Sequence, residues 1–318
     1  MKDFWLLFFS LILTTAAAAQ HPLGSVNNVQ PTSCAAGFVG GSACFSATVS
    51  CPEVSDVTVR FGIKGNPTAG TIVFINGIGD TLPGGSPSFF DTYSEAGFSL
   101  AQFTFATDWE DGGNILASAC RPATLLSYLR STPSLPFCVQ AASGGAGATA
   151  YALSWYGVSL DNAELLSGPV FSNIAQGCRT PHASAVRLNP TNGSPFDDNP
   201  WYNQESSQVS AWTNTSCLPK TPSTRAILTN ETAQSILQPG AVLSFPATNL
   251  SGWVCDNGEN PSAAQAYLWF SQIATRWSLT SVSNCQGAEG VAEGTTPQET
   301  AGSEAIAEDM IRQCVKTQ

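Results

Sequence analysis

Short apolar runs alternate with segments of helical character from about residue 44 to the end of the chain. The first two runs, FSATVSC and DVTVRFGI, alternate small or polar with apolar residues, which predicts half-buried antiparallel strands. The run TIVFING at 71–77 is almost continuously apolar and predicts a strand buried on both faces. Further strands are expected at 100–106, at the start of 137–157, from 162, at 241–246 or 253–255, and at 277–283. Helices are expected at 88–97, at 121–130, in the second half of 137–157, at 261–276 and at 303–313.

Antiparallel strands followed by alternating strands and helices predict an α/β fold with a mostly parallel sheet and helices on both faces. The alternation stops at residues 172–237, which are rich in Asn, Pro, Ser and Thr and are expected to form an insertion. Residues 287–302 hold few large apolar side chains and are expected to form a loop. No Pro/Ser-rich linker divides the chain, so residues 20–318 are expected to form a single domain.

The N-terminus has the pattern of a secretory signal peptide. Lys2 precedes an apolar run at 4–13, and the small-residue tract at 16–19 resembles a cleavage site. We expect residues 1–19 to be removed, so that the mature chain begins near Gln20 or His21. The apolar run is too short to span a bilayer, and no later segment approaches the ~20 apolar residues needed. A secreted protein without a membrane span is therefore predicted.

The cysteine pattern agrees with export. Ten cysteines and no C-x-x-C pair in a secreted chain favour disulfides over a metal site. Proximity in the sequence favours pairing Cys178 with Cys217 and Cys285 with Cys314. If the source is eukaryotic, three sequons supply glycan acceptors: Asn214, Asn230 and Asn249.

The charge balance excludes some classes of partner. The net charge is -11, with only 12 Lys plus Arg. Such a chain has no basic stripe to neutralise phosphates, which argues against nucleic acid and anionic membranes as partners.

The stretch AASGG, with Ser143 at its centre, marks a tight turn between a strand and a helix. One interpretation is a corner where small residues let the helix pack closely on its strand. A second is a dinucleotide fingerprint, since Gly145, Gly147 and Ala150 fit G-x-G-x-x-A. That fingerprint normally opens a fold, whereas this turn follows about the fifth strand, and Glu164 lies at the wrong end of the next strand. A secreted protein also has no supply of nicotinamide, so no cofactor is expected.

The third interpretation is a nucleophile elbow. A serine at so sharp a turn leaves no room for side chains beside it, which explains its small neighbours. The turn lifts the Ser143 Oγ clear of the sheet, and the N–H of Gly144 can point at a developing oxyanion.

With this turn and this strand order, residues 44–314 resemble the secreted α/β-hydrolases, an esterase- and lipase-like family. That family carries an oxyanion loop after its third strand, the elbow after its fifth and a lid after its sixth. The corresponding positions here hold Asn76-Gly77-Ile78-Gly79, Ser143 and the insertion at 172–237. The resemblance implies that Ser143 is the nucleophile and that Gly144, Gly77 and Ile78 form the oxyanion hole.

The chain departs from the family at the catalytic base. The family's acid follows the seventh strand, where Asp256 stands, with Glu259 as the second choice. The histidine should follow the eighth strand, but that region offers Glu289 and no histidine. The two histidines of the chain are His21, near the mature N-terminus, and His182, in the insertion. The base therefore stays open between His182 and Glu289.

The leading prediction is a secreted serine hydrolase that acts on carboxylic esters of a small or medium, partly apolar substrate, with no cofactor and no metal. The alternative is a catalytically degenerate relative that binds a ligand or performs a non-hydrolytic step such as a cyclisation or isomerisation. The acid-rich patch at 108–111 follows the fourth strand and is expected to be a solvated loop, with pocket lining or loose cation binding as alternatives.

Overall fold

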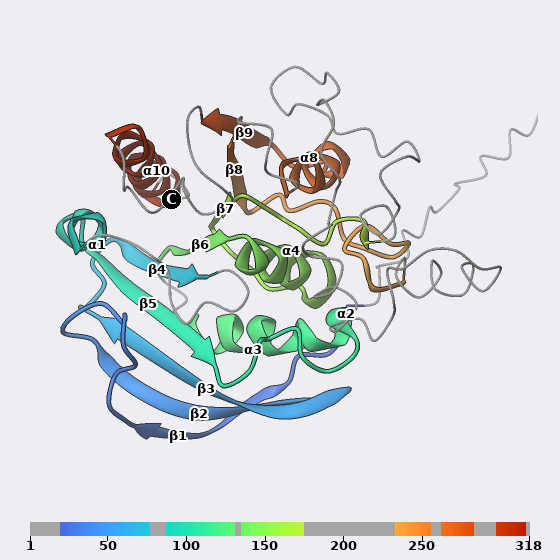
Figure 1. Ribbon diagram of the computed structural model, residues 1–318, viewed down its shortest axis with the longest axis horizontal. Helices are drawn as coiled ribbons and strands as arrows, with labels where there is room; N and C mark the ends of the chain where they lie inside the picture. The colour runs from blue at the N-terminus through green and yellow to red at the C-terminus, as the bar shows by residue number, and fades with distance from the viewer. Residues whose placement is uncertain are drawn as a thin grey trace, which may run out of the picture.

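The computed structural model describes residues 20–76, 87–130, 135–174, 233–255, 262–282 and 297–315. These residues form one nine-stranded sheet with helices on both faces (Figure 1). None of the helices within these ranges is long and apolar enough to cross a membrane. In chain order the elements are β1 Ser25–Pro31, β2 Ala43–Cys51, β3 Val54–Lys64, β4 Gly70–Ile75, α1 Pro87–Glu95, β5 Phe98–Phe105, α2 Ile115–Ser118, α3 Cys120–Leu129, β6 Phe137–Ala142, α4 Gly144–Tyr156, β7 Asn162–Leu166, β8 Asn249–Cys255, α8 Ser262–Gln272, β9 Trp277–Val282 and α10 Pro297–Val315.

The strand order is β1-β2-β3-β5-β4-β6-β7-β8-β9. The pairs β1–β2, β2–β3 and β3–β5 are antiparallel, and every pair from β5–β4 to β8–β9 is parallel. This confirms the expected mostly parallel sheet. Because β4, β6, β7 and β8 run in the same direction, their carboxyl ends meet at one edge, where the sites of α/β proteins are built.

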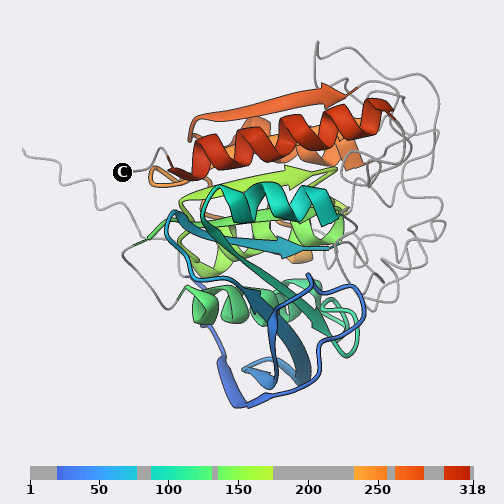
Figure 2. The ribbon, with the colours of Figure 1, turned by 90° about the vertical axis from the view of Figure 1, so that its left-hand side faces the viewer.

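Two helical layers cover the sheet. Helices α3, α4 and α8 lie on one face, and α1 and α10 lie on the other (Figures 1 and 2). Helix α4 is buried along its whole length, so it has no polar face to turn toward water. The larger apolar core lies on the α4 side of the sheet, and a smaller one joins α1 and α10 to β4, β5 and β6.

The structure adds one strand that the pattern did not predict. Strand β1 pairs only with β2 at the edge of the sheet, and nearly all its residues are exposed. An exposed edge strand needs no apolar face, so its sequence, SVNNVQP, carries no strand periodicity. The turn at Ser143 consequently follows the sixth strand of the molecule.

Other boundaries also differ from expectation. Of the two alternatives for the seventh predicted strand, only the second lies in a strand, β8. The expectation of a loop up to residue 302 is wrong, because α10 begins at Pro297. Proline is favoured in the first turn of a helix. Strand β7 ends at Leu166, and Ser167 then adopts a φ of 53°. Most of the insertion at 172–237 lies outside the described residues.

Three disulfides lie within the described residues: Cys34–Cys44, Cys51–Cys120 and Cys138–Cys314. The predicted pairing of Cys285 with Cys314 is therefore wrong. Cys138 lies on the face of β6 that α10 covers, so packing of the C-terminal helix brings together two cysteines 176 positions apart. The predicted pair of Cys178 and Cys217 lies outside the described residues.

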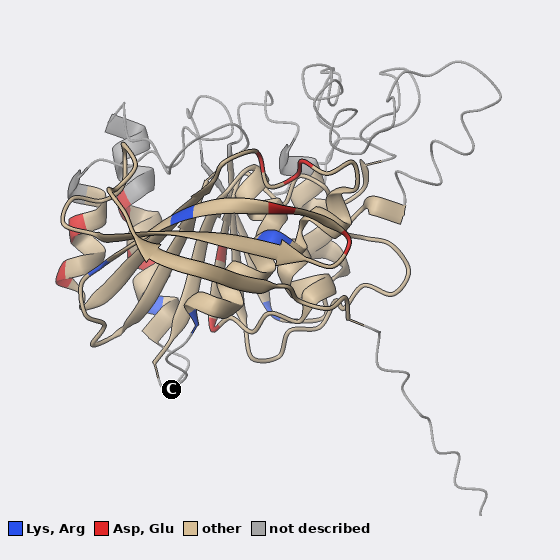
Figure 3. Ribbon diagram, turned by 90° about the horizontal axis from the view of Figure 1, so that it is seen from below, with Lys and Arg blue, Asp and Glu red and all other residues tan. Residues whose placement is uncertain are grey.

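Charged side chains are sparse and spaced apart along the ribbon (Figure 3). In the described part of the chain, ion pairs join Lys64 to Asp91, Arg130 to Asp161 and Arg312 to Asp309, and each pair has at least one partner that is partly or fully exposed. Such pairs contribute at most about 1 kcal/mol each to stability. The apolar cores and the disulfides therefore carry the fold.

Candidate active site

Ser143 occupies a strained turn between β6 and α4. Its φ of 49° and ψ of -114° are unusual for a residue with a side chain. The backbone N–H of Ser143 donates to the carbonyl of Leu166 at 2.8 Å, and the N–H of Gly147 donates to the Ser143 carbonyl at 3.1 Å. Backbone contacts to β7 and to the first turn of α4 thus hold the serine in this conformation.

The Ser143 side chain is available for chemistry. It is half-buried and does not cap α4, although it occupies the N-cap position, where serine usually does so. The first N–H groups of a helix have no partner inside it, and the helix dipole makes that end positive. The N–H of Gly144, the first residue of α4, is therefore suited to stabilise negative charge that develops beside Ser143.

The small residues around Ser143 are needed for close packing. A Cβ on Gly145 would lie 2.5 Å from the carbonyl oxygens of both Ile75 and Asn76, at the end of β4. A Cβ on Gly147 would lie 2.7 Å from the ring of Phe171. The turn is therefore pressed against the carboxyl end of β4, where the predicted oxyanion loop begins.

Replacing Gly145 with alanine should lower the free energy of unfolding by about 1–3 kcal/mol, because rigid backbone rather than a flexible side chain occupies the space. Urea denaturation followed by circular dichroism measures the change. Gly40→Ala is the matched control, since nothing lies within 4 Å of a Cβ at that position. Equal stabilities of the two variants would contradict the close packing.

Apart from Gly144, the other predicted site residues lie outside the described residues. Asp256 directly follows Cys255, the last residue of β8, and the carboxyl ends of β8 and β6 lie at the same end of the sheet. The positions of Glu259, Gly77 and Ile78 are likewise outside the described residues. So are those of both candidates for the base, His182 and Glu289.

His21 does lie within the described residues, and it lies far from Ser143. Its ring contacts Trp155 and Tyr156, with centroid separations of 5.7 Å, and its backbone N–H donates to the Trp155 carbonyl at 2.8 Å. Trp155 is twelve positions after Ser143 along α4, which corresponds to about 18 Å. His21 therefore cannot take a proton from Ser143.

A buried polar network crosses the strands that lead to the site. The Gln140 Nε2 donates to the Tyr93 hydroxyl at 2.9 Å and to Oε2 of Glu164 at 2.7 Å. The Trp253 Nε1 donates to Oε1 of the same carboxyl at 2.8 Å. Gln140 lies on β6 and Trp253 on β8, so Glu164, on β7 between them, links the strand that leads to Ser143 with β8.

Glu164 is uncharged over most of the physiological pH range. Burial raises the pKa of its carboxyl to about 8, and the negative charge of Asp309 adds to this rise, while the bonds from Gln140 and Trp253 oppose it. Sequence reasoning did not identify Glu164 as part of a network, because from the sequence alone it served only as an argument against a dinucleotide site. The available signal was the pair of polar residues, Gln140 and Glu164, at corresponding positions of neighbouring apolar strands.

The acid-rich patch is only in part the solvated loop that we expected: Asp111 is exposed and Asp108 half-buried, but the two residues between them are not solvated. Glu110 is fully buried and Trp109 nearly so. Trp109 packs edge-on against Tyr151 and Phe171. The buried Arg121 guanidinium donates to the carbonyls of Trp109, Asp111 and Ser55, which fastens the patch to α3 and β3. Burial raises the pKa of Glu110 well above its ordinary value.

The patch also lacks the features of a cation site. Within the described ranges, no group of three or more His, Cys, Asp and Glu side chains is arranged to hold a metal ion. The patch is best understood as a structural element that closes the loop after β5.

Comparison with known proteins places this site in a known fold. No protein-family model and no curated protein matches the sequence. Among solved structures, acetyl xylan esterase 1 from Thermoanaerobacterium sp. JW/SL YS485 superposes with a TM-score of 0.56 at 11% identity, over 91% of this chain and 88% of its own. A puromycin hydrolase superposes with a TM-score of 0.56 at 11% identity, over 87% of this chain and 39% of its own. A Mycobacterium tuberculosis puromycin-hydrolyzing peptidase gives 0.53 at 11% identity, over 86% and 40%. The predicted α/β-hydrolase-like fold is thereby confirmed.

Proposed function

We propose that this protein is a secreted serine hydrolase that cleaves carboxylic esters of a small or medium, partly apolar substrate. The observation that carries the proposal is the strained turn at Ser143, between the central strand β6 and the N-terminus of α4, in a sheet of α/β-hydrolase order. Backbone strain of this kind is retained where it serves a site. A corner that only packs a helix on a strand would gain nothing from a strained serine.

The reaction follows from that geometry. The Ser143 Oγ attacks the ester carbonyl carbon while a base takes its proton, and the N–H groups of Gly144 and the Gly77–Ile78 loop bind the resulting oxyanion. The oxyanion then collapses, the C–O bond to the alcohol breaks, and the alcohol leaves with the proton held by the base. Water then attacks the acyl carbon while the base takes a proton from it. The bond to the Ser143 Oγ breaks, the Oγ regains its proton from the base, and the carboxylic acid leaves. Asp256 is assigned to orient and stabilise the base.

The base is either His182 or Glu289, and their different pKa values separate them. A histidine base requires the neutral imidazole, so activity should rise through about pH 6.5. A carboxylate base ionises lower and should keep activity near about pH 4. The test is the pH profile of kcat/KM for p-nitrophenyl acetate and p-nitrophenyl butyrate, measured on the wild type, His182→Ala and Glu289→Gln.

Loss of activity in one variant only, with the matching profile, would assign the base. Full activity in both variants would exclude this mechanism for the base. No ester hydrolysis by the wild type at any pH would overturn the proposed function and favour the ligand-binding alternative.

Two features support secretion. The N-terminal pattern is that of a signal peptide, and disulfides such as Cys138–Cys314 persist in oxidising compartments. Mature protein beginning near Gln20 is the expected product.

A further inference from the structure

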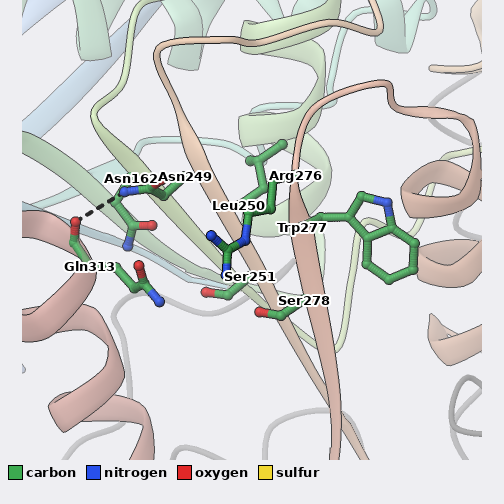
Figure 4. A pocket seen from close by; sticks show the side chains of 8 residues that line it. All are labelled: Asn162, Asn249, Leu250, Ser251, Arg276, Trp277, Ser278 and Gln313. Carbon is green, nitrogen blue, oxygen red and sulfur yellow. Dashed lines mark hydrogen bonds between the residues drawn. The ribbon is translucent and has the colours of Figure 1, made fainter. Parts of the chain in front are cut away.

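A polar cavity of about 330 Å³ lies at the amino-terminal ends of the parallel strands, whereas Ser143 lies at their carboxyl-terminal ends (Figure 4). Asn162, Asn249 and Trp277, the first residues of β7, β8 and β9, line it together with Gln313 from the last turn of α10. The Ser143 turn follows the carboxyl end of β6, so this cavity is separate from the candidate active site. Its volume suits a small molecule.

In the part of the chain that the structure describes, two residues that line this cavity each hold a buried polar atom without a hydrogen-bond partner. Asn162 is fully buried, and its Oδ1 accepts no bond, while its Nδ2 donates only to the weakly accepting sulfur of Met310 at 3.1 Å. Ser251 is 3% exposed, and its Oγ is also unpartnered. Buried polar atoms are nearly always satisfied in folded proteins, so both atoms indicate a polar occupant.

Among the described residues that line the cavity, only Arg276 carries a positive charge, and its side chain is exposed. Arg276 directs its guanidinium toward Ser251 from the segment that leads into β9 (Figure 4). None of the ion pairs found in the described part of the chain involves Arg276, and no carboxylate is among the described residues that line the cavity. The nearby Asp309 is paired with Arg312. An unpaired arginine in a protein of net charge -11 suits an anionic group, and its planar fork binds a carboxylate through two hydrogen bonds.

The remaining lining favours a compact, hydroxylated ligand. Asn162 Oδ1 requires a donor, which a ligand hydroxyl supplies, and the hydroxyls of Ser251 and Ser278 can donate or accept. The ring of Trp277 points away from the cavity and packs against Phe270 at 5.4 Å, so the described lining offers no aromatic platform for a flat ligand (Figure 4). We propose that this cavity binds a small polyhydroxylated carboxylate, such as a sugar acid, with its carboxylate on Arg276 and a hydroxyl on Asn162.

The test is isothermal titration calorimetry of the full mature protein with sodium D-glucuronate, D-glucose and sodium acetate. Glucuronate should bind with a Kd of about 1 mM or tighter, and glucose and acetate at least about tenfold more weakly, because each lacks one half of the recognised chemistry. Arg276→Gln should weaken glucuronate binding about tenfold or more, and Ser251→Ala by a smaller factor. Arg60→Gln, at an exposed arginine on β3, is the matched control and should leave binding unchanged.

Mass spectrometry first examines Asn249, whose sequon lines the cavity and whose Nδ2 donates to the Gln313 carbonyl at 3.2 Å. A glycan on Asn249 would fill the cavity and overturn the proposal. No heat from glucuronate up to about 20 mM, or equal affinities of the wild type and Arg276→Gln, would overturn the proposal. Equal affinity for acetate would overturn the hydroxyl contact, and equal affinity for glucose would overturn the role of the charge. Binding should persist in Ser143→Ala, so this result is independent of the proposed hydrolysis.

Discussion

Replacing Ser143 with alanine will lower kcat/KM for p-nitrophenyl acetate by about 10⁴- to 10⁶-fold, the loss typical of removing the nucleophile from a serine hydrolase. The physical reason is that the Oγ provides the only covalent route through the acyl intermediate, whereas the N–H of Gly144 can only stabilise charge. The measurement is steady-state hydrolysis with a variant whose thermal unfolding matches that of the wild type.

The matched control is Ser159→Ala, which removes an exposed serine hydroxyl from the segment after α4. It should keep wild-type activity. A Ser143→Ala protein within about tenfold of the wild type would show that any esterase activity arises elsewhere, because even one well-placed catalytic group contributes more than that.

Stability will fall as the pH rises from about 4.5 to about 8, and Glu164 will account for much of the fall. In this window the folded protein keeps Glu164 protonated, with its pKa raised by burial to about 8, while the unfolded chain ionises it. The native state then binds more protons than the unfolded state, so the free energy of unfolding declines by about 1.4 kcal/mol per pH unit. The stabilising contribution of Glu164 is fully present below about pH 4.5. By about pH 8 the free energy of unfolding has fallen by roughly 4–5 kcal/mol, and above that pH it falls no further on account of Glu164.

Glu164→Gln should flatten this decline, because glutamine stays neutral at every pH. Urea denaturation of the wild type and the variant between about pH 5 and pH 8 gives the two slopes, whose difference should approach 1.4 kcal/mol per pH unit. Glu95→Gln, at the exposed end of α1, is the control and should follow the wild type. Parallel curves for the wild type and Glu164→Gln would contradict a neutral buried carboxyl. Glu110 is unchanged in all three proteins, so its own raised pKa cancels in the comparison.

Local patterns predicted much of the architecture. Strands buried on both faces appear as continuous apolar runs, so β4 and β6 could be located from their residues alone. The turn at Ser143 was also visible, because the close approach of neighbouring backbone demands small residues in its immediate sequence. Strand β1 was missed because an exposed edge strand has no buried face to leave a periodic signal.

Contacts between distant segments could not be predicted in the same way. The pairing of Cys138 with Cys314 depends on how α10 packs across the sheet, which no spacing rule encodes. The network of Glu164 depends on the register of β6, β7 and β8, and the cavity near Arg276 on the meeting of three strand starts with one helix end. The chemistry of the base stays a sequence prediction, since His182 and Glu289 lie outside the described residues.

The proposed hydrolysis requires that Ser143 be an activated nucleophile. The most direct test is to treat the mature protein with a fluorophosphonate, digest it and locate the adduct by mass spectrometry. A phosphonylated Ser143, absent when the protein is denatured first, is the predicted result. No adduct at Ser143, in protein that is folded and binds or turns over other ligands, would contradict the account.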